Sequence, residues 1–283
     1  MPRPVRWLHV PKSGSTFINV LARYACPSLA SSGVAFVISM EFEQWRLQNN
    51  GTACKGLLPP WLGHTPVRAQ DRAPQRAHTL VAVFRAPSQR LISGFHHTEG
   101  GVANSMIAPG MPPGQRAAMQ RAAAGSPARY ARWPGIAGCA TKMLLGWQCA
   151  SQHRLSSADT ERAVHALEQF AFIGLLEHWT TSVCVFHALL WNASRPAPAE
   201  LALAHVGSHR LAASGASRDA ARLGRFRYNE SVLHGFVDVH DERVYSAAKK
   251  RFWADARRTQ CEPPRAAGGA RSSRSSSGRQ LPY

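Results

Sequence analysis

Acidic residues are scarce in this sequence. It has 16 aspartates and glutamates against 34 lysines and arginines, which gives a formal net charge of +18 at pH 7. Four of these positive charges are arginines beyond residue 262, where there is no acid, so 18 − 4 leaves +14 for residues 1–262. Such a charge favours nucleic acid, an anionic membrane surface or a polyanionic substrate as partner. The charge alone does not select among these three.

The sequence also lacks paired cysteine motifs and an N-terminal apolar segment. None of the six cysteines forms a C-x-x-C pair, so we expect no zinc or other metal site. The even number permits up to three disulfides, and Cys139 and Cys149 are the first pair to test. No signal peptide or membrane-spanning apolar run precedes Val5. We therefore expect either a soluble protein or a chain whose anchor lies outside this sequence.

Residues 5–17 read VRWLHVPKSGSTF and predict a strand, a polar turn and the start of a helix. A strand that enters a helix through a glycine-bearing turn directs free backbone N–H groups and the positive helix end at one point. Lys12 adds a full charge there. We expect a phosphate-like or sulfate-like group on this turn. Its candidate ligands are Lys12, Ser13, Gly14, Ser15 and Thr16.

This turn differs from the common nucleoside-triphosphate loop. That loop reads G-x-x-x-x-G-K-[ST], with its lysine directly after the second glycine. Here Lys12 precedes Gly14 by two residues, and no glycine stands upstream. The spacing therefore argues against a Walker-type loop.

A second anion-binding pattern follows a later apolar run. Thr79–Phe84 predicts a buried parallel strand, which ends at Arg85 because Pro87 cannot continue it. Ser93 lies eight residues after Arg85, on the helix expected next. An arginine at a strand end and a serine on the following helix can converge on one phosphate, which guanidinium binds through paired donors.

Together these segments resemble the sulfotransferases that use 3′-phosphoadenosine-5′-phosphosulfate (PAPS). Residues 11–16 resemble their 5′-phosphosulfate loop, P-K-x-G-[ST]-[ST], and residues 84–95 resemble their 3′-phosphate segment, R-[DN]-P-x-x-R-x-x-S-x-[YF]. Ala86 departs from the family, which carries an acidic or amide residue there. The resemblance implies that residues 12–16 bind the 5′ end of PAPS, that Arg85 and Ser93 bind its 3′-phosphate, and that no metal takes part.

The resemblance extends to a candidate catalytic base. Leu62-Gly63-His64 lies between the two phosphate segments, and in heparan and uronyl 2-O-sulfotransferases a Gly-His at this place carries the base. The resemblance therefore implies that His64 takes the acceptor proton and that Lys12 assists the leaving group. Histidine suits this role because its ordinary pKa is about 6.5. The next candidates for the base are Glu99, His96 and His97.

Residues 139–146, 170–177 and 241–252 also resemble segments of these Golgi-type, membrane-associated enzymes. A carbohydrate acceptor is implied, and an acidic polysaccharide would use the remaining positive charge. No specific nucleic acid is expected, and membrane association would require an anchor absent from this sequence. Three Asn-x-Ser/Thr sequons are typical of a secretory lumen and are consistent with a Golgi location. They begin at Asn50, Asn192 and Asn229.

Apolar runs alternating with helical patterns predict an α/β fold, with a P-loop-type parallel sheet flanked by helices in a single domain over residues 1–262. Ligands of such sheets bind at the carboxyl ends of the strands. The long connection over residues 99–138 is a candidate cover for the acceptor, and residues 263–283 are expected to be a disordered tail. The predicted strands are residues 5–10, 33–39, 57–62, 79–84 and 170–175.

Two other classes of function stay open from the sequence. A P-loop nucleotide kinase or NTPase would bind ATP with magnesium rather than PAPS. A basic nucleic-acid-binding protein would bind DNA or RNA in a salt-sensitive way that does not depend on Lys12. A sulfotransferase fold that binds PAPS without turnover is a third possibility.

Overall fold

A computed structural model describes most of the chain. It covers residues 3–30, 32–36, 39–49, 54, 56–58, 64–99, 111–191, 195–202 and 227–262. At its centre lies a three-stranded parallel sheet with the order β1-β2-β3. Its strands are β1 (Arg6–Leu8), β2 (Leu80–Phe84) and β3 (Phe170–Leu175). All three strands are almost wholly buried, as expected for a parallel sheet covered on both faces. β2 and β3 are apolar, whereas β1 contains Arg6, whose guanidinium is paired with the buried Asp71.

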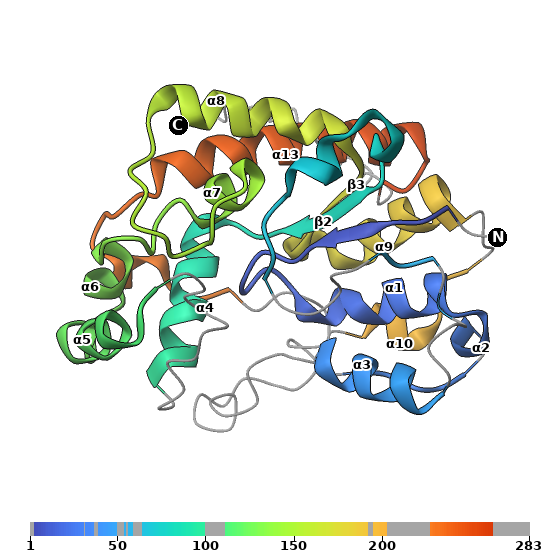
Figure 1. Cartoon of the computed structure of the whole chain (residues 1–283), viewed down its shortest axis with the longest axis horizontal. Coiled ribbons are helices and arrows are strands. Elements are labelled where there is room, and N and C mark those ends of the chain that lie inside the picture. The colour runs from blue at the N-terminus through green and yellow to red at the C-terminus, as the bar shows by residue number, and fades with distance from the viewer. Residues whose placement is uncertain are drawn as a thin grey trace, which may run out of the picture.

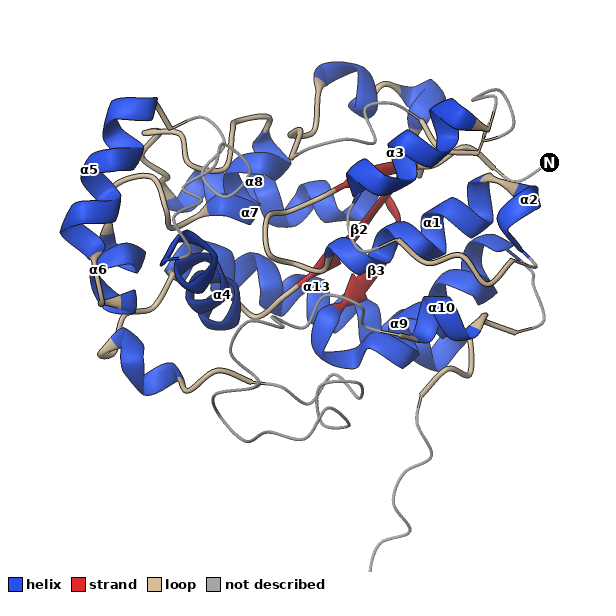
Figure 2. Ribbon diagram, turned by 90° about the horizontal axis from the view of Figure 1, so that it is seen from below, coloured by secondary structure: helices blue, strands red, loops and turns tan. Residues whose placement is uncertain are grey.

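Helices cover the sheet on both sides. In Figure 1, α7, α8 and α13 lie above the sheet, whereas α1, α3 and α10 lie below it. Figures 1 and 2 both place α5 and α6 beyond α4, at one end of the molecule. The helices are α1 (Ile18–Ala25), α2 (Pro27–Ala30), α3 (Ser39–Gln48), α4 (Pro87–Glu99), α5 (Pro113–Ala123), α6 (Pro127–Arg132), α7 (Cys139–Leu145), α8 (Ser157–Ala166), α9 (Trp179–Phe186), α10 (Pro198–Leu201) and α13 (Val239–Arg258).

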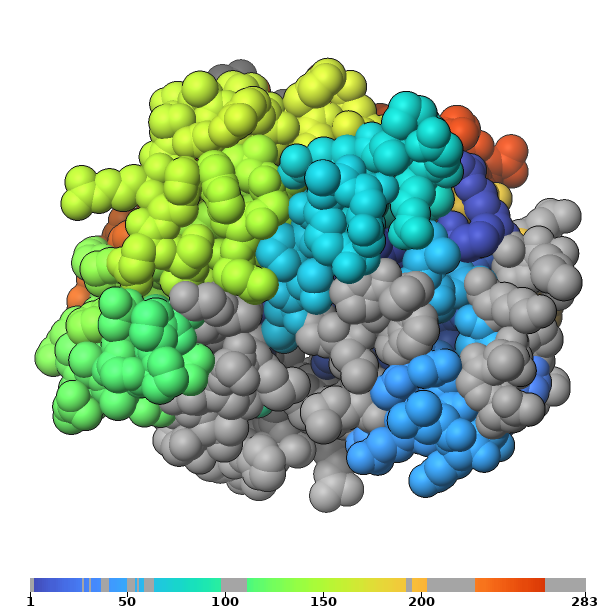
Figure 3. Space-filling model, in the orientation of Figure 1, coloured from blue at the N-terminus to red at the C-terminus, as the bar shows by residue number. Residues whose placement is uncertain are grey.

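Two apolar clusters stabilise these layers. The larger one contains the strands together with α1, α9 and α13, and Phe17, Phe172 and Phe186 pack ring against ring within it. The smaller one joins α4, α5 and α6 through Phe95, Tyr130 and other buried side chains. In the space-filling view, the green α5–α6 segment adjoins the yellow-green α7–α8 segment at this end (Figure 3). The described part of the long connection is therefore helical and packed.

The prediction of a strand at residues 33–39 is wrong. Residues 32–36 have no regular structure, and Ser39 begins α3. Side chains of α1 satisfy this backbone instead of a neighbouring strand. Asn19 donates to the Phe36 carbonyl over 2.8 Å and accepts from its N–H over 2.6 Å, while Arg23 donates to the carbonyls of Ser32 and Val34. A strand ladder is not needed where side chains supply the partners.

Of the strand predicted over residues 57–62, the structure describes residues 57 and 58, and Leu57 forms a parallel bridge with Val5. Residues 59–63 lie outside the described residues. The predicted strands at 5–10, 79–84 and 170–175 correspond to β1, β2 and β3, and the mixed α/β class with a parallel sheet is confirmed. None of the helices in the described ranges has the length and apolar character needed to cross a bilayer.

All six cysteines form disulfides. Cys26 pairs with Cys54, and Cys184 on α9 pairs with Cys261 beyond α13. Cys139 and Cys149, the pair singled out from the sequence, are bonded to each other.

We expect the disulfides to stabilise the fold unequally. Cys184–Cys261 spans 77 residues and Cys139–Cys149 spans 10. Loop-closure entropy then gives about 4.5 kcal/mol for the longer loop and about 2.7 kcal/mol for the shorter one. Replacing Cys184 and Cys261 by alanine should therefore lower the free energy of unfolding by about 2 kcal/mol more than replacing Cys139 and Cys149. Guanidinium titrations of both double variants test this, and the reverse order would contradict it.

Candidate active site

The turn between β1 and the first helix has the backbone of an anion site. Lys12 and Gly14 both have positive φ, at 65° and 103°, and the Phe17 N–H donates to the Gly14 carbonyl over 3.2 Å. Ser15–Phe17 forms a 3-10 turn that runs directly into α1. Its first N–H groups lack helical partners, as at any helix start. The turn therefore presents free donors at the carboxyl end of β1.

Gly14 cannot be replaced easily in this turn. Its φ lies in the left-handed region, which side chains disfavour. A Cβ at this position would also stand 2.9 Å from Cδ1 of Leu176, in the segment that follows β3. The turn after β1 and the segment after β3 thus pack against each other here, and the positive φ is the main reason for glycine.

Ser13 supplies an observation that bears directly on a ligand. Its side chain is 2% exposed, and its Oγ is buried with no hydrogen-bond partner in the described structure. A buried hydroxyl without a partner costs about 1–3 kcal/mol, so an unpaired one calls for an explanation. An anion bound on the turn would supply an acceptor for Ser13, and Ser15 and Thr16 lie at the adjoining helix start.

Arg85 joins the second predicted segment to this turn. It follows β2 directly, and its Nη1 donates to the carbonyl of Lys12 over 3.2 Å. Burial lowers the pKa of Arg85, while Tyr228 and Glu177 act in the opposite direction. The structure thus brings together Arg85 and Lys12, which are 73 residues apart. Ser93 is buried in the second turn of α4, the helix that starts just after Arg85.

The surroundings of Lys12 lower the pKa of its ammonium group. Burial first, and then repulsion by the neighbouring Arg85 guanidinium, lower its pKa to about 8. An anionic ligand bound beside both cations would relieve the repulsion between Lys12 and Arg85.

One hydrogen bond fixes the tautomer of His64. Its Nδ1 lies 2.8 Å from the backbone carbonyl of His9. A carbonyl can only accept, so Nδ1 carries the hydrogen and the neutral ring keeps a lone pair on Nε2. The pKa of His64 is lowered to about 4, mainly by burial; the His9 carbonyl acts against this shift, and Lys12 contributes to it. The expected value near 6.5 is thus too high for the free protein, and His64 is neutral at pH 7.

The ring of His64 contacts a neighbouring ring. His9 stacks on Trp7, with centroids 4.0 Å apart, and also contacts the tilted ring of His64, with centroids 4.4 Å apart. His9 is itself 8% exposed, and its pKa is well below the ordinary value because it is buried beside His64 and Lys12. Sequence analysis did not single out His9, although it lies only three residues before Lys12.

Tyr228 and Gln89 also escaped the sequence analysis. The Arg85 guanidinium lies over the Tyr228 ring, 5.5 Å from its centroid. The Gln89 amide holds the Tyr228 backbone from both sides, since it donates to the Tyr228 carbonyl over 3.1 Å and accepts from its N–H over 2.8 Å. These residues are 139 positions apart, so no local pattern reveals the contact.

The carboxylate of Glu177 caps the turn at Ala86, a position that has no polar side chain of its own. One carboxylate oxygen accepts from the Ala86 N–H over 2.8 Å, and the other accepts from the Tyr245 hydroxyl over 3.1 Å. Glu177 follows β3, so the third strand end also contributes to the site. In the sequence, the resemblance of residues 170–177 to a sulfotransferase segment was the only feature that drew attention to Glu177.

Two other basic residues, in the segments over residues 84–95 and 139–146, are structural. Arg90 lies 3.5 Å from carboxylate oxygens of both Asp238 and Asp241. The ammonium of Lys142 donates to three backbone carbonyls over 3.0 Å each. Both cations are therefore occupied within the protein. The alternative base His96 has its ring against that of Tyr228, with centroids 5.3 Å apart.

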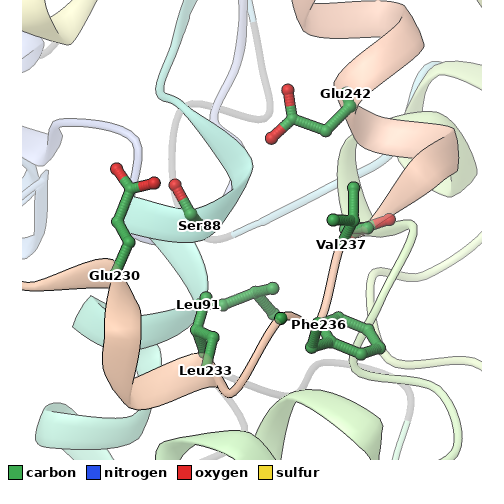
Figure 4. Close-up of a pocket in the computed structure, with 9 residues that line it drawn as sticks. Ser88, Leu91, Glu230, Leu233, Phe236, Val237 and Glu242 are labelled. Carbon is green, nitrogen blue, oxygen red and sulfur yellow. The ribbon is translucent and has the colours of Figure 1, made fainter.

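A pocket of about 230 Å³ lies elsewhere, and none of residues 11–16 lines it. Figure 4 shows Glu230 and Glu242 at its edge, with Leu91, Leu233 and Phe236 beneath. The pKa of Glu242 is raised by burial and by the neighbouring carboxylates of Glu230 and Asp241. Because these acids repel anions, we do not assign this pocket to a phosphate. Within the described ranges, no group of three His, Cys, Asp or Glu side chains could hold a metal ion.

Comparison with known proteins identifies no relative. No family model, no curated protein and no solved structure matches this chain.

The titration of His64 predicts a loss of stability in acid. Between pH 6.5 and about 4 the unfolded chain binds a proton that folded His64 does not, so the free energy of unfolding falls as the pH drops through this range. His64→Asn keeps an N–H donor for the His9 carbonyl and removes this titration. Urea titrations at several pH values should show a smaller acid loss in the variant than in the wild type. Parallel curves would contradict a buried, neutral His64.

The comparison with the variant is needed because Asp238 has the opposite effect on stability as the pH falls. Burial first, and then the charge of Asp241, raise the pKa of Asp238 to about 7. The folded protein therefore takes up this proton before the unfolded chain does, which stabilises it as the pH falls from about 7. Asp238 is unchanged in His64→Asn, so its contribution cancels in the difference.

Proposed function

We propose that this protein is a sulfotransferase with a P-loop-type sheet that moves the sulfuryl group of PAPS to a hydroxyl of a carbohydrate. The observation that carries the proposal is the direct bond between the two predicted anion sites, from Arg85 to the Lys12 carbonyl at the carboxyl ends of neighbouring parallel strands. A nucleotide with phosphates at both its 5′ and 3′ positions needs two such sites close together.

The residues present fit the nucleotide. Ser13 has an unpartnered buried hydroxyl, Gly14 has the backbone that lets N–H groups converge, and Ser15 and Thr16 begin the helix. These residues would hold the 5′ end. Arg85 and Ser93 would hold the 3′-phosphate, with Tyr228 against the guanidinium. Bidentate guanidinium binding suits a terminal phosphate.

When bound, PAPS would supply an activated sulfuryl group. His64 would take the acceptor proton on Nε2, the nitrogen that the His9 carbonyl leaves unprotonated. Lys12 would neutralise charge on the leaving phosphate oxygen, in a site shielded from water. Phosphate charge beside Lys12 would also favour the imidazolium and so raise the pKa of His64 toward the working range. An acidic polysaccharide in a Golgi-type lumen is the proposed acceptor class, and the net charge of +18 is compatible with it.

Binding of adenosine 3′,5′-bisphosphate tests the proposal. Calorimetry should show that adenosine 3′,5′-bisphosphate binds clearly more tightly than adenosine 5′-monophosphate, because Arg85 and Ser93 would contact the 3′-phosphate. Arg85→Ala should weaken bisphosphate binding by about 2–4 kcal/mol, as expected on losing a partly buried charged contact. Arg121→Ala, which removes an exposed arginine of α5, is the matched control and should leave binding unchanged. Equal affinity for both nucleotides would contradict the proposal.

The lowered pKa of Lys12 predicts an alkaline limit to activity. The lysine loses its charge near pH 8 in the free protein, so kcat/KM for sulfuryl transfer should fall above that pH. Lys12→Arg should shift this limit to higher pH, since guanidinium stays protonated. Lys12→Ala should lower kcat by about 10²–10³-fold. An alkaline limit that is unchanged in Lys12→Arg would remove Lys12 from the reaction.

A further inference from the structure

We infer that Asn229 is a site of N-linked glycosylation. Asn229-Glu230-Ser231 is one of three Asn-x-Ser/Thr sequons in the chain, and it is the one whose asparagine lies within the described residues. Asn50 and Asn192 lie outside them. The inference does not depend on the proposed sulfotransferase activity.

The conformation of Asn229 is compatible with a glycan. Its side chain is exposed, in the extended residue that precedes the 3-10 turn Glu230–Leu233. Its Oδ1 accepts from the Ser231 N–H over 3.0 Å and so caps that turn. An N-glycan is joined to Nδ2, which donates to no protein acceptor in the described structure. The cap and the sugar therefore use different atoms of one side chain.

The neighbouring residues separate the glycan from the candidate active site. Tyr228 lies against Arg85, and Gln89 holds its backbone. Glu230 is also tied to Gln89, whose Nε2 donates to Glu230 Oε1 over 2.8 Å. These contacts hold the segment on either side of Asn229 without using its Nδ2. A sugar on Asn229 leaves the contacts of Tyr228 and Glu230 intact.

The disulfides provide a second, independent argument. All six cysteines are paired, and such a fold belongs to an oxidising compartment. Asparagine glycosylation is characteristic of secreted proteins, and its acceptor sequons lie on surface loops. The pairing of the cysteines and the exposed sequon thus indicate the same environment.

The modification is a group transfer from a lipid-linked oligosaccharide pyrophosphate. A bond forms between Asn229 Nδ2 and C1 of the sugar, while the bond from C1 to the pyrophosphate oxygen breaks. The lipid pyrophosphate leaves with the electron pair, and Nδ2 gives up one of its two protons to the transferring enzyme. No oxidant or reductant is needed.

Peptide mapping of the full-length protein from the cells that make it tests this inference. Enzymatic deglycosylation in ¹⁸O-labelled water should convert Asn229 into a labelled aspartate. An unmodified Asn229 peptide from the disulfide-bonded protein would overturn the inference.

Two variants of the full chain, made in those cells, test the sequon itself. Ser231→Ala removes the hydroxyl but keeps the backbone N–H that Asn229 caps, and it should lose the label. Ser231→Thr should keep it. Labelling that persists in Ser231→Ala would also count against the inference. The affinity for adenosine 3′,5′-bisphosphate should be equal in Ser231→Ala and the wild type. This affinity tests the proposed function, and the label on Asn229 tests glycosylation, so either can fail without the other.

Discussion

The hydrogen bond from Arg85 to the Lys12 carbonyl is the contact on which the candidate site depends. Hydrogen bonds to charged groups contribute about 1.5–3 kcal/mol, and this one joins the turns that follow β1 and β2. Tyr228 lies against the same guanidinium, and Glu177 caps the next residue, Ala86. The ends of all three strands therefore meet around Arg85. Because each turn braces the other, the residues that we propose as donors to two phosphates are positioned before any ligand arrives.

This arrangement is electrostatically costly without an anion. Arg85 and Lys12 repel each other, and burial strips both of water, which lowers the pKa of each. His9 and His64 avoid adding charge by staying neutral. Ser13 leaves a buried hydroxyl without a partner. An anion on the turn would relieve the repulsion and satisfy that hydroxyl, and these unmet requirements point to the same kind of ligand.

The sequence predicted the features that are local. Apolar runs located β1, β2 and β3, and the glycine and proline positions placed both turns at strand ends. It failed where side chains distant in sequence replace local structure. Asn19 and Arg23 satisfy the backbone of residues 32–36, so the apolar run there forms no strand. Gln89 and Tyr228 meet across 139 residues, which no periodicity encodes. The low pKa of His64 likewise comes from tertiary burial and not from residue type.

A crystal structure of the complex with adenosine 3′,5′-bisphosphate is the most direct test of the central claim. The account predicts the 5′-phosphate on the backbone N–H groups of residues 13–16, with Ser13 Oγ as a donor, and the 3′-phosphate on Arg85 and Ser93. The Arg85–Lys12 contact should persist in the complex. A nucleotide bound elsewhere, for example in the pocket beside Glu230 and Glu242, or one that left Ser13 Oγ without a partner, would contradict it.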